Sequence, residues 1–597
     1  MADLWRATRA LGRQVYRADP VRTVASTAVN VGATVCDALG AVALKYLVDA
    51  ITAADSGGVV GASAFVVATL AGSLLGHWAS VTLGMALRER STLQLDTHLA
   101  RLSLGIHHLE HHERPDYLDQ LEVLRRNHQR LAAVHDAMIA NLTTVVRLCI
   151  VIGILGGIHP LLLLLPLGGV PTLLANVKVA RMRHAVEDEV AASYRFRARM
   201  FEIATTRDAA KELRIFGAGE DVRRRWDEAR AAGDAIEERI EARGALLAMV
   251  SWLAFGVAMT AALLLVAREA TEGRATAGDV VLALTMAGSV NWGVGGLAHS
   301  VTWLLDNLKM GRRLLWLEDL AAEAAGRATP RAARPVPERL SEGIRLEGVT
   351  FRYPATDADV LRAVDLFLPA GSTVAVVGDN GAGKTTLVKL LCRFYDPTEG
   401  RITVDGTDLR DLDVGEWRAR LSGCFQDFAR LELLAREVVG VGHLPHLDSE
   451  PAVAAALDRA HAAEVPAMLP GGLGAQLGRS FDGGVEPSTG QWQKLALGRA
   501  MMREAPLLLV LDEPTASLDP STEHALFERY AGAASDAARR SGAITVLVSH
   551  RFSTVRMADL IVVFCDGGVA EIGTHQELVA AEGTYAELYG LQARAYG

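Results

Sequence analysis

The sequence predicts a multidomain protein: an all-α transmembrane domain of six helices with long cytoplasmic helical extensions, followed by an α/β domain. Three observations support this fold class. Long stretches of the first half lack charged residues, Arg-rich helical segments separate these stretches, and short continuous apolar runs recur in the second half. With 597 residues, 50% of them hydrophobic, the chain is long enough for several domains and is not a disordered protein.

Six candidate membrane spans stand out in the first half. Four stretches contain no Asp, Glu, Lys or Arg, and two more contain only a few such residues. A helix needs about 20 apolar residues to cross the hydrocarbon of a bilayer. We therefore expect spans at about 21–50, 59–87, 137–158, 160–180, 244–267 and 280–305.

The distribution of Arg and Lys predicts the orientation of these spans. Five Arg residues lie between residues 6 and 22, and segments 88–130 and 178–243 are rich in Arg, whereas the loop at 52–58 contains no Lys or Arg. Because basic residues concentrate on the cytoplasmic side, the N-terminus, both long segments and everything after residue 306 are expected in the cytoplasm. This pattern is typical of a multi-pass protein of the cell membrane.

Each long cytoplasmic segment contains a helix-start signal near its middle. Pro115 opens one helical stretch, since proline suits the first helical position. Thr205 and Asp208 have the spacing of a capping box. We therefore expect short helices near 115–125 and 205–213, available for docking.

A change of composition marks the second half. Residues 321–343 are rich in Ala, Arg and Pro and predict a linker between a domain at 1–320 and a domain at 344–597. Continuous apolar runs are typical of the strands of a buried parallel sheet. Such runs occur at 373–377, 507–511, 544–548 and 560–564.

The first apolar run leads into a phosphate-binding loop. Residues 378–385 read GDNGAGKT, which matches G-x-x-x-x-G-K-[ST] between a strand and a helical run. Backbone N–H groups of such a loop surround phosphates, Lys384 would contact the β and γ phosphates, and the Thr385 hydroxyl would bind Mg²⁺. The phosphates of a nucleotide and Mg²⁺ are therefore the expected ligands of this loop.

The second apolar run ends in two carboxylates. Asp512 closes the run and Glu513 follows it directly. An acidic residue at the end of a buried strand can hold Mg²⁺, and the next carboxylate is placed to orient or deprotonate an attacking water. By itself this pair could simply be a strand end that meets solvent, but beside a phosphate loop it indicates nucleotide hydrolysis.

Further motifs follow in a recognisable order. Tyr353 lies in FRYP, Gln426 in CFQDF, residues 517–519 read SLD, and His550 lies in VSHR. With these motifs the second half resembles the ATPase domain of ABC transporters. The whole chain resembles an exporter-type half-transporter, similar to bacterial peptide, lantibiotic and multidrug exporters.

The resemblance implies a role for each matching residue. Glu513 would be the catalytic glutamate and His550 the switch histidine. The residues that would bind Mg²⁺ are Thr385, Gln426 and Asp512. Residues 517–519 would form the D-loop, and the short helices of the cytoplasmic segments would be coupling helices. The implied nucleotide-binding residues are Tyr353, Gly378, Asp379, Asn380, Gly381, Ala382, Gly383, Lys384, Thr385, Thr386, Gln426, Asp512, Ser488, Gly490 and Gln491.

One motif departs from the family pattern. The signature LSGGQ is PSTGQ here, at residues 487–491, so that Thr489 replaces a glycine. In this family the signature of one subunit closes on the ATP held by the other, and a side chain at this position hinders close backbone approach. Two interpretations stay open: an asymmetric heterodimer, and a homodimer that tolerates the variant.

Two other features are weaker signals. Asp37 and Arg147 lie near the middle of their predicted spans, where they either line a cargo path or form a structural ion pair. Residues 107–113 read HHLEHHE and place His pairs at i, i+4, a spacing that can bind zinc on a helix, but the favoured interpretation is a solvated helix surface.

These observations lead to one functional hypothesis with alternatives. The chain is expected to be an ATP-hydrolysing membrane transporter that works as a dimer, with a second half-transporter, and exports a peptide or a hydrophobic small molecule by alternating access. The alternatives are an importer with exporter architecture for siderophore-like cargo, and a lipid flippase. A soluble ABC ATPase that acts on nucleic acid or ribosomes is disfavoured because such chains lack membrane spans.

Overall fold

The computed structural model describes residues 15–114, 117, 118, 120–125, 134–329, 334–354, 356–514 and 538–596, together with a few residues before 15. These residues divide into two compact units. The first unit comprises Met1–Arg101 with Glu122–Leu317, and the second comprises Leu102–Leu121 with Glu318–Gly597. We call them the helical unit and the ATPase unit, the second name being taken from the family that its sequence resembles.

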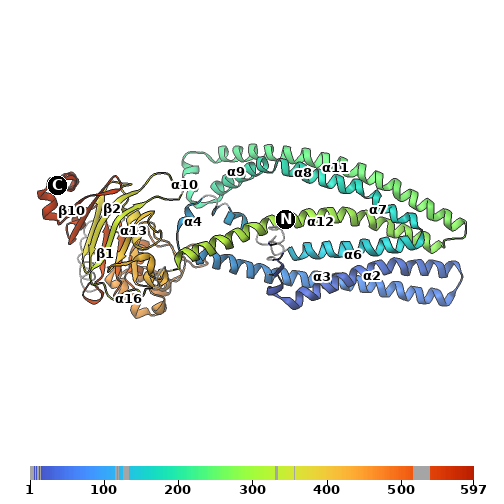
Figure 1. Ribbon diagram of the computed structural model, residues 1–597, viewed down its shortest axis with the longest axis horizontal. Helices are drawn as coiled ribbons and strands as arrows, with labels where there is room; N and C mark the ends of the chain where they lie inside the picture. Colours follow the sequence, from blue (N-terminus) through green and yellow to red (C-terminus); the bar gives the residue numbers. More distant parts are fainter. Residues whose placement is uncertain are drawn as a thin grey trace. The chain divides into compact units, whose positions relative to one another are not determined.

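The helical unit consists of long helices (Figure 1). Helix α11 packs along α9 and α8, and α2 packs along α6. The helices, some of which continue into the ATPase unit, are α2 Pro20–Thr52, α3 Ser56–Gly105, α6 Val134–Ile158, α7 Leu165–Gly168, α8 Val170–Ala185, α9 Glu187–Thr205, α10 Arg207–Ile215, α11 Gly219–Thr271 and α12 Ala277–Ala328, with a 3-10 turn η1 at Pro160–Leu164.

In the part of the chain that the structure describes, six helical stretches are long and apolar enough to cross a membrane, which confirms the predicted number of spans. They are Pro20–Thr52, Ser56–Gly105, Val134–Ile158, Pro160–Arg183, Gly219–Thr271 and Ala277–Leu297. The chain is therefore a multi-pass membrane protein. The fourth span is broken into η1, α7 and α8, since Pro166 and Pro171 lie in the first turns of α7 and α8 and lack a backbone N–H.

The start of α2 shows how the sequence fixes a helix end. The Asp19 carboxylate accepts a hydrogen bond from the backbone N–H of Arg22 at 3.0 Å, and Pro20 occupies the first helical position. An acidic cap satisfies one of the N–H groups that the first turn leaves without a partner.

Two expectations about the cytoplasmic segments are wrong in detail. The helix α10 begins at Arg207 with Thr206 as its N-cap, and Thr205 still belongs to α9, so Thr205 is not the N-cap that the predicted capping box requires. The His-rich run 107–113 is not one helix, because only α4 Glu110–Glu113 is helical; the i, i+4 geometry for zinc is therefore lost. Pro115 and Asp116 lie outside the described residues.

The described residues of the ATPase unit form two sheets. A four-stranded sheet has the order β2-β1-β4-β5, and a six-stranded sheet has the order β10-β9-β3-β8-β7-β6. The strands are β1 Gly343–Phe351, β2 Leu361–Pro369, β3 Thr373–Gly378, β4 Glu399–Val404, β5 Thr407–Asp408, β6 Leu421–Cys424, β7 Leu508–Asp512, β8 Ile544–Val548, β9 Leu560–Cys565 and β10 Gly568–Gly573.

The four predicted strands are confirmed, and they are parallel neighbours as expected. Strand β3 pairs in parallel with β8 and β9, and β8 pairs in parallel with β7. All four are buried along most of their length because both faces of this sheet are covered. The carboxyl ends of β3 and β7 therefore open on the same edge of the sheet.

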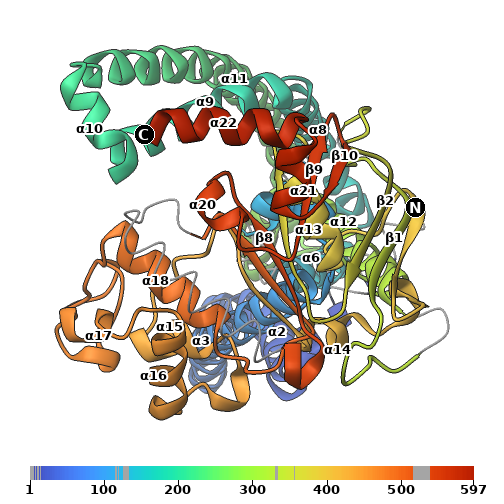
Figure 2. The same cartoon turned by 90° about the vertical axis from the view of Figure 1, so that its left-hand side faces the viewer.

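Helices complete the unit around these sheets. They include α13 Lys384–Leu391, α14 Val414–Ala419, α15 Ala435–Gly440, α16 Glu450–Arg459, α17 Val465–Met468, α18 Thr489–Ala500, α20 Phe552–Val555, α21 His575–Ala580 and α22 Thr584–Tyr596. Helices α15 to α18 gather in one subregion (orange in Figure 2). Its apolar core is separate from the core between the sheets.

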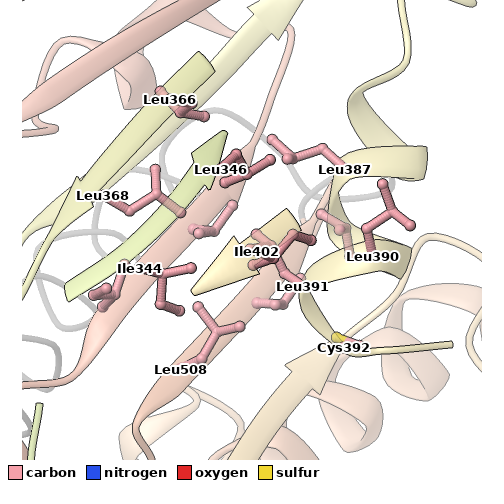
Figure 3. Close-up of a cluster of buried hydrophobic side chains, with 14 of the residues drawn as sticks. Ile344, Leu346, Leu366, Leu368, Leu387, Leu390, Leu391, Cys392, Ile402 and Leu508 are labelled. Atoms are coloured by element: carbon pink, nitrogen blue, oxygen red, sulfur yellow. The ribbon is translucent and has the colours of Figure 1, made fainter. Parts of the chain in front are cut away.

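The core between the two sheets holds α13 in place. Ile344, Leu346, Leu366 and Leu368 of the four-stranded sheet face Leu387, Leu390 and Leu391 of α13, with Leu508 of β7 alongside (Figure 3). Burial of each of these side chains stabilises the fold by about 1.5–3 kcal/mol. The first turn of α13 follows the phosphate loop directly, so this core fixes the site.

The segment between the units is partly helical. Helix α12 continues to Ala328, so the first part of the predicted linker 321–343 is helix, and β1 begins at Gly343. The domain limits 1–320 and 344–597 stay predictions.

Candidate functional site

The loop between β3 and α13 has the backbone of a phosphate cradle. Gly378 has φ of 147° and Gly383 has φ of 101°, values in the region that favours glycine. A Cβ atom would lie 2.2 Å from the Phe564 carbonyl oxygen at Gly378 and 2.5 Å from Leu361 Cδ2 at Gly383. Both glycines are therefore required by the loop, and the first N–H groups of α13 are left to bind an anion.

Lys384 lies inside this loop. Its Nζ donates hydrogen bonds to the carbonyl oxygens of Gly378 at 2.7 Å and Asp379 at 2.8 Å. Burial lowers the pKa of Lys384, while the nearby Glu513 carboxylate acts in the opposite direction. The ammonium group is thus held where a phosphate bound to the loop would meet it.

Asp512 is the buried carboxylate at the end of β7. It is 2% exposed, and burial raises its pKa to about 6 against the effect of a hydrogen bond from Thr385. Among the described residues, its Oδ1 atom has no hydrogen-bond partner. A buried carboxylate oxygen without a partner, next to a threonine hydroxyl, is the oxygen ligand set that Mg²⁺ prefers. The two residues therefore fit the predicted metal.

Glu513 is held between two polar side chains. Gln426 Nε2 donates to Glu513 Oε2 at 2.9 Å, and His550 Nδ1 lies 3.3 Å from Glu513 Oε1. The Glu513 backbone has φ of 47°, and its N–H donates to the Val548 carbonyl at 3.0 Å. A strained backbone at a carboxylate that two partners orient is a feature of functional sites. The structure thus brings together Glu513 and His550, to which the resemblance gave a role in hydrolysis, and Gln426, to which it gave a role in Mg²⁺ binding.

Tyr353 lies beside the first turns of α13. Its hydroxyl is 3.0 Å from the Thr386 hydroxyl, and its ring makes edge contacts with Phe351 at 4.9 Å and Tyr395 at 5.4 Å between centroids. These contacts hold the ring next to the phosphate loop, as expected of a residue that stacks on a base.

The signature residues lie at the start of α18. Ser488 is the N-cap and forms a capping box with Gln491: Ser488 N–H donates to Gln491 Oε1 at 2.8 Å, and Gln491 N–H lies 3.3 Å from Ser488 Oγ. Gly490 has open space where a Cβ would lie. These residues bond to one another rather than to the loop around Lys384, and residues 517–519 lie outside the described part of the chain.

Sequence reasoning missed one cation near this site. Lys389 Nζ lies 5.1 Å from the centre of the Tyr353 ring. The helical spacing from Thr386 to Lys389 was the available signal, because residues three apart share a helix face.

The helical unit carries paired charges within its spans. Arg147 Nη2 donates to Asp37 Oδ2 at 2.8 Å, Ser73 also bonds Asp37, and His77 Nε2 is 3.9 Å from it. The sequence left open whether Asp37 and Arg147 line a cargo path or form an ion pair, and the structure shows the ion pair.

A cavity of 340 Å³ lies elsewhere among α2, α3 and α6. Its polar lining includes Asn30 and Ser80, which bond each other, and Arg88, whose Nε lies 3.2 Å from Asp136 Oδ2. Apolar side chains such as Met85 complete the lining. Groups of three or more His, Cys, Asp or Glu side chains that could hold a metal are not found among the described residues of either unit.

Comparisons with known proteins agree with this geometry. The family described as ABC transporter matches residues 361–516. A protein named ATP-dependent lipid A-core flippase, from Chromohalobacter salexigens, is 41% identical over 257 residues, which cover 43% of this chain and 42% of that protein. The chain thus spans 42% of the length of this relative.

Two further comparisons cover more of the chain. The Subtilin transport ATP-binding protein SpaT from Bacillus subtilis is 27% identical over 477 residues, 79% of this chain and 75% of that protein. A solved structure of a bacterial Atm1-family ABC exporter with ATP bound superposes with a TM-score of 0.75 at 24% identity, and covers 98% of both chains. The fold of the whole chain is therefore that of an ABC exporter.

Proposed function

We propose that this chain, which carries an ABC transporter ATPase domain behind a helical domain with the exporter fold, hydrolyses ATP to move cargo across a membrane. The observation that carries the proposal is Glu513, held by Gln426 and His550 beside a phosphate loop and a partly unsatisfied buried carboxylate. This arrangement has the parts that phosphoryl transfer to water requires.

The residues of the site divide the chemistry between them. Lys384 and the N–H groups at the start of α13 bind the phosphates of ATP, and Tyr353 stacks on its base. Thr385, Asp512 and Gln426 would hold Mg²⁺. When Mg²⁺ is bound, it neutralises part of the negative charge of the phosphates. Glu513 accepts the proton of the attacking water, while His550 and Gln426 keep its carboxylate in line.

A second half-transporter completes the transporter in this proposal. One chain carries one phosphate loop and one signature, and Ser488, Gly490 and Gln491 would close on the ATP of the other subunit. We favour a second copy of this chain, because Thr489 leaves the helix start and its capping box intact. Closure of the two ATPase units would drive alternating access of the spans.

The proposed cargo is a peptide or another amphiphile, moved outward. The support is the mixed lining of the cavity among α2, α3 and α6, where the polar groups of Asn30, Arg88 and Asp136 stand next to Met85 and Val81. Asn30 and Ser80 lie inside predicted spans, where polar groups are costly and are by default functional. The names of the relatives, a lipid A-core flippase and a subtilin transport protein, belong to the same broad class of cargo.

Transport in vesicles of defined sidedness tests the function. In inside-out vesicles, we expect ATP-dependent uptake of peptides or amphiphiles, and stimulation of ATP hydrolysis by the same compounds. The matched control is Glu513→Gln, which keeps the binding loop and removes the proposed base. Uptake that proceeds equally with this variant contradicts the function, and ATP-dependent movement in the opposite direction supports the importer.

A further inference from the structure

Part of the first cytoplasmic segment belongs to the ATPase unit. We call residues 107–113 the docked segment; it includes α4. The Leu109 N–H donates to the Phe394 carbonyl at 3.1 Å, and His108 Nε2 lies 3.6 Å from Asp396 Oδ2. His108 and His111 are each 4% exposed. The docked segment is therefore packed on the residues that directly follow α13.

Two ion pairs connect the docked segment to the rest of the unit. Glu110 accepts a hydrogen bond from Arg327 Nη1 at 2.9 Å. Glu113 Oε1 lies 3.3 Å from Lys389 Nζ, on the last turn of α13. The second pair has a further neighbour, because Lys389 also lies next to the Tyr353 ring of the nucleotide site.

Lys389 links Glu113 to Tyr353. Its Nζ is 5.1 Å from the centre of the Tyr353 ring and 5.7 Å from that of Tyr395. Burial acts to lower the pKa of Lys389, but Tyr353 and Glu113 outweigh it, so the net shift is upward and the amine stays charged. A cation over a ring and an ion pair with a carboxylate together hold Lys389 between the docked segment and Tyr353.

Helix α13 is eight residues long, about 12 Å, and it carries three of the contacts around the site. Lys384 lies at its phosphate end, Thr386 bonds the Tyr353 hydroxyl, and Lys389 lies over the Tyr353 ring. The position of Tyr353 therefore depends on α13 at Thr386 and, through Lys389, on the docked segment.

We propose that Glu113 and Lys389 are positioning residues for the nucleotide base. They hold Tyr353 in the orientation that stacks on the base, so that docking of segment 107–113 and binding of the base strengthen each other. This rests on the proposed function in one respect, the role of Tyr353 as the base platform. Coupling of this kind is reciprocal: if docking raises nucleotide affinity, nucleotide raises the stability of docking by the same factor.

Nucleotide binding to the purified full-length protein tests the proposal. Lys389→Met removes the charge and keeps the stem, and Glu113→Gln keeps the shape and removes the carboxylate. We expect each to weaken ATP binding by about three- to tenfold, the contribution of a partly desolvated cation–π contact. Inorganic tripolyphosphate, which has phosphates but no base, is expected to bind both variants as it binds the wild type.

Three matched variants show whether the effect passes through Tyr353. Arg327→Met breaks the pair with Glu110 on the same segment and is expected to leave ATP affinity unchanged within about twofold. Lys389→Arg keeps the charge and is expected to restore ATP affinity. In Tyr353→Leu, adding Lys389→Met is expected to cause no further loss, because the platform is already absent.

Hydrogen exchange measures the reciprocal effect. Addition of ATP is expected to slow exchange of the Leu109 N–H in the wild type, and less so in Lys389→Met. Equal losses of ATP and tripolyphosphate binding, or unchanged ATP binding in both Glu113→Gln and Lys389→Met, overturn the positioning role. Wild-type protein that does not bind ATP contradicts instead the proposed function.

Discussion

In the ATPase unit the polar side chains of the site converge on a place where a ligand can bind, whereas in the helical unit the charges of Asp37 and Arg147 are paired with each other. Asp512 keeps one carboxylate oxygen without a partner among the described residues, and Gln426 and His550 orient the Glu513 carboxylate beside it. Asp37 and Arg147, by contrast, form an ion pair 2.8 Å apart.

The difference shows which residues in each unit are placed for a ligand and which for the fold. An unsatisfied polar atom in a protein interior costs free energy, so its persistence at Asp512 points to a ligand that completes it. An intramembrane pair such as Asp37 with Arg147 is already complete, and its main effect is on the packing of α2 against α6. The variants below test this contrast, from the largest expected effect to the smallest.

Replacement of the proposed base has the largest effect. Glu513→Gln keeps the hydrogen-bonding shape beside Gln426 and His550 but cannot accept a proton. Because a positioned general base contributes about 10²- to 10⁴-fold to a rate, we expect a loss of ATP turnover in that range with ATP binding retained. Phosphate release and nucleotide binding measured on the same sample check this. Turnover within tenfold of the wild type contradicts the role of Glu513.

The intramembrane pair is expected to affect stability rather than turnover. Asp37→Asn leaves Arg147 charged within the span without its partner, which costs about 2–3 kcal/mol. The double variant Asp37→Asn with Arg147→Gln removes both charges and is expected to recover most of this loss. Thermal unfolding in detergent measures both. A double variant that stays stable but loses cargo-stimulated ATP hydrolysis shows instead that the pair contacts cargo.

Substitution of a glycine in the phosphate loop tests whether nucleotide binding depends on the backbone conformation of the loop. Gly378→Ala places a Cβ against the Phe564 carbonyl oxygen at a φ of 147°. We expect a cost of about 1–3 kcal/mol and a matching loss of nucleotide affinity. Gly474→Ala is the control in the same unit, because nothing lies within 4 Å of its Cβ position. Thermal unfolding with and without ATP compares the two, and equal behaviour contradicts the requirement for glycine at Gly378.

The two units also differ in how much of them the sequence predicts. The phosphate loop and the strands around it are set by local patterns, namely a glycine motif and continuous apolar runs, so their existence and their parallel pairing were predictable. The six spans follow equally from composition. Arg147, the ion-pair partner of Asp37, and Glu113, that of Lys389, come from segments more than 100 residues away, and local patterns do not reveal which helix face meets which.

Two local predictions failed for a physical reason. The spacing of Thr205 and Asp208 matched a capping box, but α9 extends through Thr205, so the next helix starts one residue later than the motif requires. The His-rich run had the right spacing for a helix, but packing against the residues after α13 confines the helix to four residues. In both places the structure around the segment decided a helix boundary that the motif alone left open.

The altered signature is expected to have the smallest effect. Thr489 is exposed on the first turn of α18, and the capping box between Ser488 and Gln491 is present beside it. Since exposed substitutions away from packed contacts change free energies by about 0.5 kcal/mol or less, Thr489→Gly should change ATP turnover by no more than about twofold. The steady-state rate of phosphate release at saturating ATP measures this, with Ser488→Ala as the control that removes the cap and should destabilise the start of α18. A rise of tenfold or more in Thr489→Gly would mean that the threonine holds the two ATPase units apart, and a partner chain with a glycine at this position would then be favoured over a second copy.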